Sequence, residues 1–308
     1  MSTAANSILK HKAINGWPLF WLIVLPMNVF MVVAITGFDL SKPGDVSHMI
    51  SYSVRWAVPF IYFVLAASAM PVLFPGAVSQ WWMRSRKYIG LVFAVAMAWQ
   101  GAFIFIMSAI YTDYYYQDVY ALRDESEGSS GYLFLAAMVF TSFSFGRRLI
   151  SSVQWKLLHK SGTYFLWAYP FSVYWWNLYY YENPEPIDYV FYWAGFLAFA
   201  VRIAAWGKKR NQQSVKLDPG SETPLLFRGM GALLVAAGLL ASATGGVWQE
   251  TATNFLTAAQ WAAKLEIWFP FWPFEPFLPL LIMALGGLLF TYSGSMDTAR
   301  AVKPAGTV

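Results

Sequence analysis

The chain alternates long runs of hydrophobic residues with shorter polar segments. A helix needs roughly 20 predominantly apolar residues to cross a bilayer, and eight runs reach or approach that length. Pro26, Pro59 and Pro170 lie inside runs, where we expect them to bend the helices without ending them. The pattern predicts an all-α, polytopic membrane bundle of about eight transmembrane helices. The runs begin near Trp17, Arg55, Tyr88, Tyr132, Gly162, Ile187, Leu225 and Pro276.

The same pattern divides the chain into segments. We expect the run from Leu225, which is rich in Gly and Ala, to pack closely against another helix. The stretch FPFWPFEPF and the amphipathic residues before it should lie at the outer membrane interface, as an anchor or as a docking surface. The expected segments are a tail (1–16), a six-helix core (17–206), a polar linker (207–224), a helix pair with an interfacial segment (225–294) and a second tail (295–308).

Composition and charge support a membrane protein. Of the 308 residues, 58% are hydrophobic and 12% charged, which excludes an ordinary soluble enzyme. With a cytoplasmic amino terminus, all of the 21 Lys and Arg except Lys42, Arg55, Arg123 and Lys264 lie at the inner ends of the helices. The positive-inside rule then predicts a multi-pass protein of the bacterial inner membrane with both termini cytoplasmic. Because the basic residues form no stripe, the net charge of +5 does not predict a nucleic-acid partner.

Several kinds of chemistry are excluded by residue type. The chain has no cysteine, so it has no disulfide, iron–sulfur cluster or thiolate nucleophile. It also lacks a Gly-rich phosphate loop, zinc-ligand spacing and a nucleophile elbow. Whether the protein is an enzyme stays open, and an enzymatic role would make it part of an oxidoreductase.

Three motifs carry a resemblance to a known family. RSRKYIG opens the third run, TSFSFGRRL follows the fourth, and WKLLHKSGTYF opens the fifth. With these motifs, residues 17–206 resemble the ferric-reductase-like transmembrane family, most closely its haem-binding membrane subunit of bacterial methionine sulfoxide reductase. The resemblance implies a six-helix bundle in which histidines deep in the third and fifth helices hold b-type haem. His159 matches the histidine at the cytoplasmic start of the fifth helix, whereas the deep positions hold Gln100 and Ser172.

A bis-histidine haem site needs two imidazoles that face each other from different helices. Of the three histidines, only His159 stands near the bundle, and it is the candidate metal ligand, with a methionine such as Met138 as its partner. The alternative is an interfacial histidine that hydrogen-bonds lipid or a neighbouring backbone group. Gln100 and Ser172 could hydrogen-bond each other across the space that a porphyrin would fill.

Three arginines are further candidates. The resemblance places Arg147 and Arg148 where a quinone or flavin headgroup would approach, although the positive-inside rule supplies basic residues there in any case. Arg55 lies where the second helix enters the membrane and needs an acidic partner, for which Asp45 and Asp188 are the candidates.

Aromatic residues gather at the outer helix ends, in DYYYQDVY and in FLWAYPFSVYWWNLYYYEN. Such clusters are typical of an interfacial belt, and they also suit a docking surface. We therefore take Tyr115, Tyr180 and Trp272 as candidate partner-binding residues, in three segments that should converge on the outer side.

Two functions follow from these observations. In the first, the protein is a haem-free structural or accessory subunit of a membrane complex, in contact with lipids and with another membrane or periplasmic protein. In the second, it is a transmembrane electron-transfer subunit, dependent on haem b or quinone, that delivers electrons to a periplasmic partner reductase. The missing haem ligands favour the first function, without a cofactor.

Overall fold

The computed structural model describes residues 8–217, 222–258, 262, 265 and 268–292. All regular elements among them are helical, which confirms the all-α prediction. Each predicted run contains a helix, and the second, third, fourth and fifth of these helices begin about three turns before their runs. The long helices are α2 (Trp17–Thr36), α3 (Pro43–Ala66), α5 (Ala77–Ile110), α7 (Leu122–Phe140), α9 (Ser152–Tyr179), α10 (Pro186–Leu217), α11 (Leu225–Ala243) and α14 (Leu278–Phe290).

Short helical elements turn the chain between the long helices. The short elements are η1 (Lys12–Ile14), α4 (Met70–Leu73), α6 (Thr112–Tyr114), the π-helical turn η2 (Tyr115–Val119), α8 (Ser144–Arg147), α12 (Gly245–Thr257) and η3 (Glu275–Phe277).

Three of the long helices contain an internal proline. Pro26, Pro59 and Pro170 lie inside α2, α3 and α9, so these prolines do not end their helices, as predicted.

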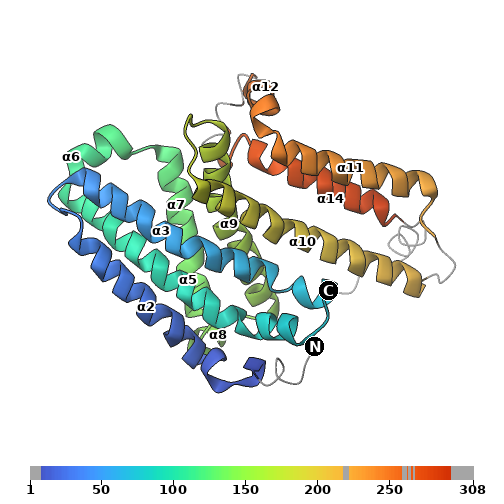
Figure 1. The fold of residues 1–308 in the computed structure, drawn as a ribbon, viewed down its shortest axis with the longest axis horizontal. Helices are drawn as coiled ribbons and strands as arrows, with labels where there is room; N and C mark the ends of the chain where they lie inside the picture. Colours follow the sequence, from blue (N-terminus) through green and yellow to red (C-terminus); the bar gives the residue numbers. More distant parts are fainter. Residues whose placement is uncertain (1–7, 218–221, 259–261, 263–264, 266–267, 293–308) are drawn as a thin grey trace.

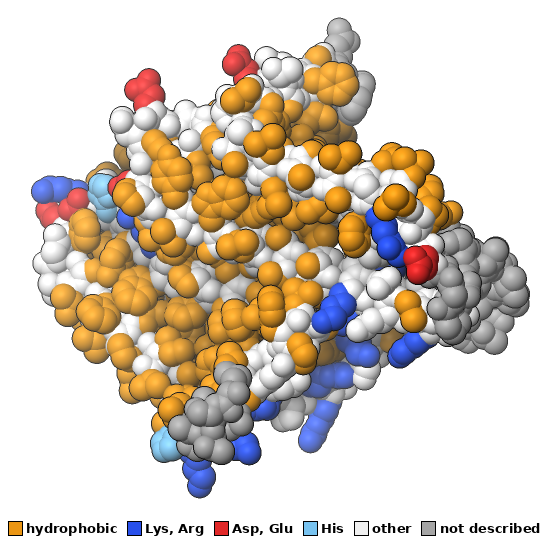
Figure 2. Space-filling view, turned by 45° about the vertical axis from the view of Figure 1, so that its right-hand side comes forward, with side chains coloured by type: hydrophobic (Ala, Val, Ile, Leu, Met, Phe, Trp, Pro, Cys, Tyr) orange, Lys and Arg blue, Asp and Glu red, His pale blue; other side chains and the backbone are white. Residues whose placement is uncertain are grey.

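Five helices of the described chain, α2, α3, α5, α10 and α11, are long and apolar enough to cross a membrane. The chain is therefore a multi-pass membrane protein. Hydrophobic side chains cover much of the face in Figure 2, and Lys and Arg gather along its lower edge. We call this end of the bundle, where α5 and α9 begin and α10 finishes, the basic end, and the opposite end the acidic end.

Successive long helices of the bundle run in opposite directions, so α2 and α5 are parallel neighbours: Trp17 lies against Tyr88, and Asn28 bonds to Trp99 further along both helices. In Figure 1, α2, α5 and α3 lie side by side, and α11 lies beside α14 beyond α10. Helix α9 packs against α3, α7 and α10. Inside the bundle, the ring of Trp167 stacks on Phe171 and Phe199, with centroid distances of 4.8 and 4.5 Å. Stacked aromatic rings thus fill the interior between α9 and α10.

Small residues bring α11 and α14 into close contact, as the sequence predicts. A Cβ atom at Gly231 would lie 2.6 Å from the backbone nitrogen of Phe290, and one at Gly238 would lie 2.6 Å from the carbonyl oxygen of Pro279. Only glycine leaves room for such an approach between backbones. Two hydroxyls join this pair to the core, because Tyr179 and Tyr192 both donate to the carbonyl oxygen of Ser242, at 2.8 and 3.0 Å.

The aromatic, proline-rich stretch folds back onto the core instead of lying wholly at the interface. The backbone N–H of Phe271 donates to the buried carboxylate of Glu127 on α7 at 2.8 Å. The ring of Phe277 packs against Trp167 at 5.8 Å. The expectation of interfacial rings fits the exposed Trp268 and Phe269 but not Phe271. Half of the amphipathic stretch before Trp268, including Lys264, and the whole second tail (295–308) lie outside the described residues.

The expected polar linker is partly helical. Helix α10 runs on to Leu217, well beyond the predicted end of the core at residue 206. Near the start of this extension, Arg210 Nε donates to the carbonyl oxygen of Thr291 at 3.4 Å, which ties α10 to the end of α14.

Candidate functional site

A cavity of about 610 Å³ opens at the basic end, between α3, α5, α7, α9 and α10. We call it the basic cavity. Its wall includes His159 and six cationic side chains, with no Asp or Glu among the described lining residues. Such a site attracts anionic or electron-rich groups. The cations are Arg86, Lys87, Arg147, Lys156, Lys160 and Arg202.

His159 is held by the end of α7. Its Nε2 lies 3.0 Å from Thr141 Oγ1, and its ring lies against the indole of Trp155 with centroids 4.3 Å apart. Trp155 Nε1 donates to the carbonyl oxygen of the same Thr141 at 3.1 Å. A capping box formed by Ser151 and Gln154 starts α9 one turn earlier and so sets where Trp155 and His159 point. The partner of His159 is thus a side-chain hydroxyl, where the alternative in the sequence analysis expected lipid or a backbone group.

The two arginines predicted to lie near a quinone or flavin headgroup, Arg147 and Arg148, differ in their contacts and exposure. Arg147 donates to the carbonyl oxygen of Ile150 and to Ser152 Oγ, both at 2.8 Å, so it braces the turn between α8 and α9 while lining the basic cavity. Arg148 is exposed and does not line the cavity.

Arg202, which the sequence marks only as one more basic residue, is the best-connected cation of the cavity. It donates to Tyr164 Oη at 2.9 Å, to the carbonyl oxygen of Leu65 at 3.0 Å and to Ser68 Oγ at 2.7 Å. It therefore joins α3, α9 and α10. In the sequence, Arg202 lies well before the Lys-rich end of α10. This separate position is the signal that could have distinguished it from the other basic residues.

Gln100 belongs to a second cavity, of about 280 Å³, nearer the acidic end. Gln100 Oε1 accepts a hydrogen bond from Tyr132 Oη at 3.0 Å. Ser172 is buried, donates to the carbonyl oxygen of Tyr169 at 2.8 Å and lines neither cavity. The hydrogen bond expected between Gln100 and Ser172 is thus replaced by separate bonds to nearer partners. The two cavities share a partition formed by Phe93, Leu135 and Leu166, which line both.

The described residues do not fit a bis-histidine haem. His159 supplies one imidazole to the basic cavity, and Met138 lines the same cavity. His11 lies before α2, where its Nδ1 accepts from the backbone N–H of Ala13 at 3.2 Å, and His48 stacks on Phe38 at the far end of the bundle. In the described part of the chain, no group of three or more His, Cys, Asp or Glu could hold a metal ion.

Arg55 has a different acidic partner from those predicted. Its guanidinium pairs with Glu185 at 2.8 Å. Asp188 instead accepts from the side chain of Asn177 at 2.9 Å and from the backbone N–H of Glu185 at 2.8 Å, and Asp45 accepts from the backbone N–H of Asp39 at 2.8 Å. The prediction of Asp45 or Asp188 was wrong because local hydrogen bonds already occupy both carboxylates.

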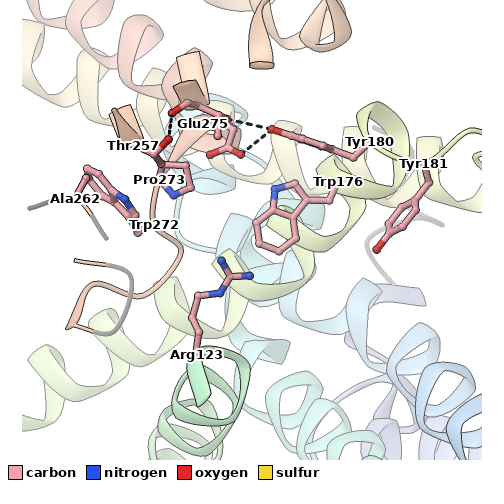
Figure 3. A pocket seen from close by; sticks show the side chains of 10 residues that line it. Arg123, Trp176, Tyr180, Tyr181, Thr257, Ala262, Trp272, Pro273 and Glu275 are labelled. Carbon is pink, nitrogen blue, oxygen red and sulfur yellow. Dashed lines mark hydrogen bonds between the residues drawn. The ribbon is translucent and has the colours of Figure 1, made fainter. Parts of the chain in front are cut away.

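A pocket of about 510 Å³, the aromatic pocket, lies at the acidic end (Figure 3). It brings together two of the predicted partner-binding residues, Tyr180 and Trp272, with Trp176 from the end of α9. Tyr115 is not part of it. Its ring is buried beside α5 and α7, and its hydroxyl donates to Glu125.

Glu275 is the residue of this pocket that the sequence analysis missed. Its side chain is among the most deeply buried polar groups, at 2% exposure, and its Oε1 accepts from Tyr180 Oη at 3.1 Å. Glu275 Oε2 and Trp272 Nε1 have no hydrogen-bond partner within the described structure. A single acid inside the otherwise apolar FPFWPFEPF is the signal that could have found it.

Comparison with protein-family models, with curated proteins and with solved structures gives no match to this chain. The resemblance to the ferric-reductase-like family therefore rests on the three sequence motifs alone.

Proposed function

We propose that the chain is a haem-free membrane protein that acts as a structural or accessory subunit of a membrane complex. The strongest support is the hydrogen bonding of the three residues at positions where the resemblance would lead one to expect haem ligands. Gln100, Ser172 and His159 each have a hydrogen-bond partner from the chain itself. Gln100 joins α5 to α7 and His159 joins α9 to the end of α7, while Ser172 bonds within α9.

We further propose a membrane frame for this subunit. All eight long helices cross the bacterial inner membrane, and the basic end, with both termini and the linker, faces the cytoplasm. The gathering of Lys and Arg along one edge of the molecule supports this orientation through the positive-inside rule (Figure 2).

Exposed aromatic residues support a partner at the acidic end. Tyr116 is 62% exposed, Tyr181 68% and Trp268 78%. Large exposed rings, with carboxylates such as Glu182 beside them, suit a protein interface in which the rings supply buried area and the charges select the partner.

An absorption spectrum tests the haem-free part of the proposal. We expect the protein, purified in mild detergent, to show no strong α band in the reduced-minus-oxidised difference and far less than one haem per chain. A stoichiometric b-type spectrum would refute the proposal directly.

Site-specific photocrosslinking tests the accessory role. Crosslinkers at Tyr116, Tyr181 and Trp268 should capture the same protein neighbour in native membranes. A crosslinker at Leu233, an exposed apolar position on α11, is the matched control and should label lipid. If all four positions label only lipid, and the native complex keeps its size after Tyr181→Ala with Trp268→Ala, the accessory role is refuted.

The basic cavity favours a second candidate, a quinone- or flavin-dependent electron-transfer subunit that serves a periplasmic reductase. Six cations around a 610 Å³ space would suit the polar end of such a molecule. Extraction of the purified protein should then release quinone or flavin near one per chain, and Arg202→Gln should reduce that yield more than Arg148→Gln. If the parent protein and both variants all release far less than one quinone or flavin per chain, only the accessory-subunit proposal remains.

A further inference from the structure

The aromatic pocket has the features of a built binding site that the proposed function does not use. Its walls come from Arg123 on α7, from the end of α9, from α12 and from the loop before α14. Its volume of about 510 Å³ lies within the range of about 300–1,000 Å³ that is typical of small-molecule sites. In Figure 3, the side chains of Trp176, Tyr180 and Trp272 surround this space.

The carboxylate of Glu275 indicates the charge of the ligand. A buried carboxylate is costly unless it is paired and fully hydrogen-bonded. Glu275 lines the pocket. Tyr180 Oη donates to its Oε1, while its Oε2 is buried without a partner in the described structure. Burial raises the pKa of Tyr180, and the nearby carboxylates of Glu275 and Glu250 add to this rise. The Tyr180 side of the pocket is therefore acidic.

The rings indicate the rest of the ligand. The faces of Trp and Tyr rings attract cations, most strongly where water is excluded. Trp176 already holds one cation in this way, since the guanidinium of Arg123 lies 5.4 Å from its ring centroid. Trp272 adds a buried indole N–H without a partner among the described residues, which suits an oxygen atom carried by the same ligand.

We propose that the aromatic pocket binds an organic ammonium cation, with its charge at Glu275 Oε2, its alkyl groups against the rings of Trp176 and Tyr180, and a neighbouring oxygen at Trp272 Nε1. Two sources carry this chemistry, a free amino alcohol and the ammonium headgroup of a zwitterionic phospholipid.

The experiment measures choline binding by calorimetry to the full chain in nanodiscs of phosphatidylglycerol, which has no ammonium group. The neutral probe 3,3-dimethylbutan-1-ol has nearly the same shape as choline without its charge. We expect saturable choline binding and at least about tenfold weaker binding of the neutral alcohol. This comparison needs no variant, so it does not depend on whether a mutant folds.

Variants then assign the binding to the pocket. Glu275→Gln keeps the acceptor for Tyr180 and removes the charge, and it should weaken choline binding by about tenfold or more. Glu182→Gln removes an exposed carboxylate from the neighbouring loop and should change binding less than about twofold. Trp272→Phe keeps a ring and removes the indole N–H, so it should weaken choline more than tetramethylammonium, which has no oxygen.

Nanodiscs of phosphatidylcholine distinguish the two sources. If the headgroup occupies the pocket, choline binding disappears in them and returns in phosphatidylglycerol; if the ligand is a free amine, both lipids give the same affinity. The proposal is overturned if choline and the neutral alcohol bind equally, if neither binds in phosphatidylglycerol, or if Glu275→Gln has no more effect than Glu182→Gln. These measurements use the isolated protein, so they are independent of any partner subunit.

Discussion

Thr141 joins α7 to α9 through two different atoms. Its hydroxyl meets His159 Nε2, and its carbonyl oxygen accepts from Trp155 Nε1. Both bonds lie beside the basic cavity, so this one residue fixes the wall that carries His159. The tryptophan and histidine pattern at the start of the fifth helix has a structural use here that does not depend on haem.

Substitution of Thr141 tests this role. Thr141→Val keeps the shape but removes the hydroxyl, which leaves His159 Nε2 without its partner. We expect a loss of about 1 kcal/mol of stability, because hydrogen bonds between membrane helices contribute about that much. The measurement is thermal unfolding in detergent. Ser142→Ala is the control, because Ser142 Oγ, in the turn after α7, donates only back to the carbonyl oxygen of Met138 on α7 and makes no bond to the described residues of α9. Equal effects of the two changes would argue against the proposed link.

The sequence does not identify which acidic residue pairs with Arg55. The sequence correctly marks Arg55 as a residue that needs an acid, but it does not rank the acids nearby. Asp188 lies three residues after Glu185 at the start of α10 and bonds back to the backbone N–H of Glu185, as the second half of a capping box does. This local bond uses Asp188 and leaves the Glu185 carboxylate for Arg55.

At the scale of elements, the contact between α11 and α14 rests on glycines, and it can be tested within one helix. Gly231→Ala places a Cβ within 2.6 Å of backbone on α14, whereas a Cβ at Gly229 meets nothing within 4 Å. We expect Gly231→Ala to lower stability by about 1–3 kcal/mol, as overpacking does. Gly229→Ala should be neutral or slightly stabilising, since alanine favours helix.

Thermal unfolding and limited proteolysis of the connection between α11 and α14 measure both variants. Faster cleavage of Gly231→Ala, with Gly229→Ala unchanged, would show that the pair has separated. If Gly229→Ala is cleaved faster than Gly231→Ala, or if both variants are cleaved at the same rate, α11 and α14 do not pack through Gly231.

Helices were predictable because their apolar runs have the length that a bilayer requires. The fold-back of the aromatic, proline-rich stretch was not predictable. Its hydrophobic residues follow no helix or strand period that would indicate which side of the stretch is buried. Its position depends on the bond from Phe271 to Glu127, two residues that are distant in the sequence. The same limit applies to the aromatic pocket, since Tyr180 and Glu275 meet only after α11, α12 and α14 have packed.

At the scale of the molecule, α14 decides whether the carboxyl terminus lies on the same side as the amino terminus. It has 13 residues, or about 20 Å of helix, which is short for a hydrocarbon core of roughly 30 Å. Its two ends nevertheless lie beside the two ends of α11. Gly238 packs against Pro279 near the start of α14, and Thr223 Oγ1, just before α11, donates to the carbonyl oxygen of Tyr292 at 2.8 Å.

Because α11 is long and apolar enough to cross, a helix that reaches both of its ends should cross with it. We therefore expect a fluorescent reporter fused after Val308 to be active in the cytoplasm, like one inserted at Gln212 near the end of α10. A periplasmic phosphatase inserted at Asp118, between α5 and α7, should be active and supplies the opposite control. Phosphatase activity after Val308, with Gln212 still cytoplasmic, would mean that α14 turns back within the membrane. The chain would then have an odd number of crossings.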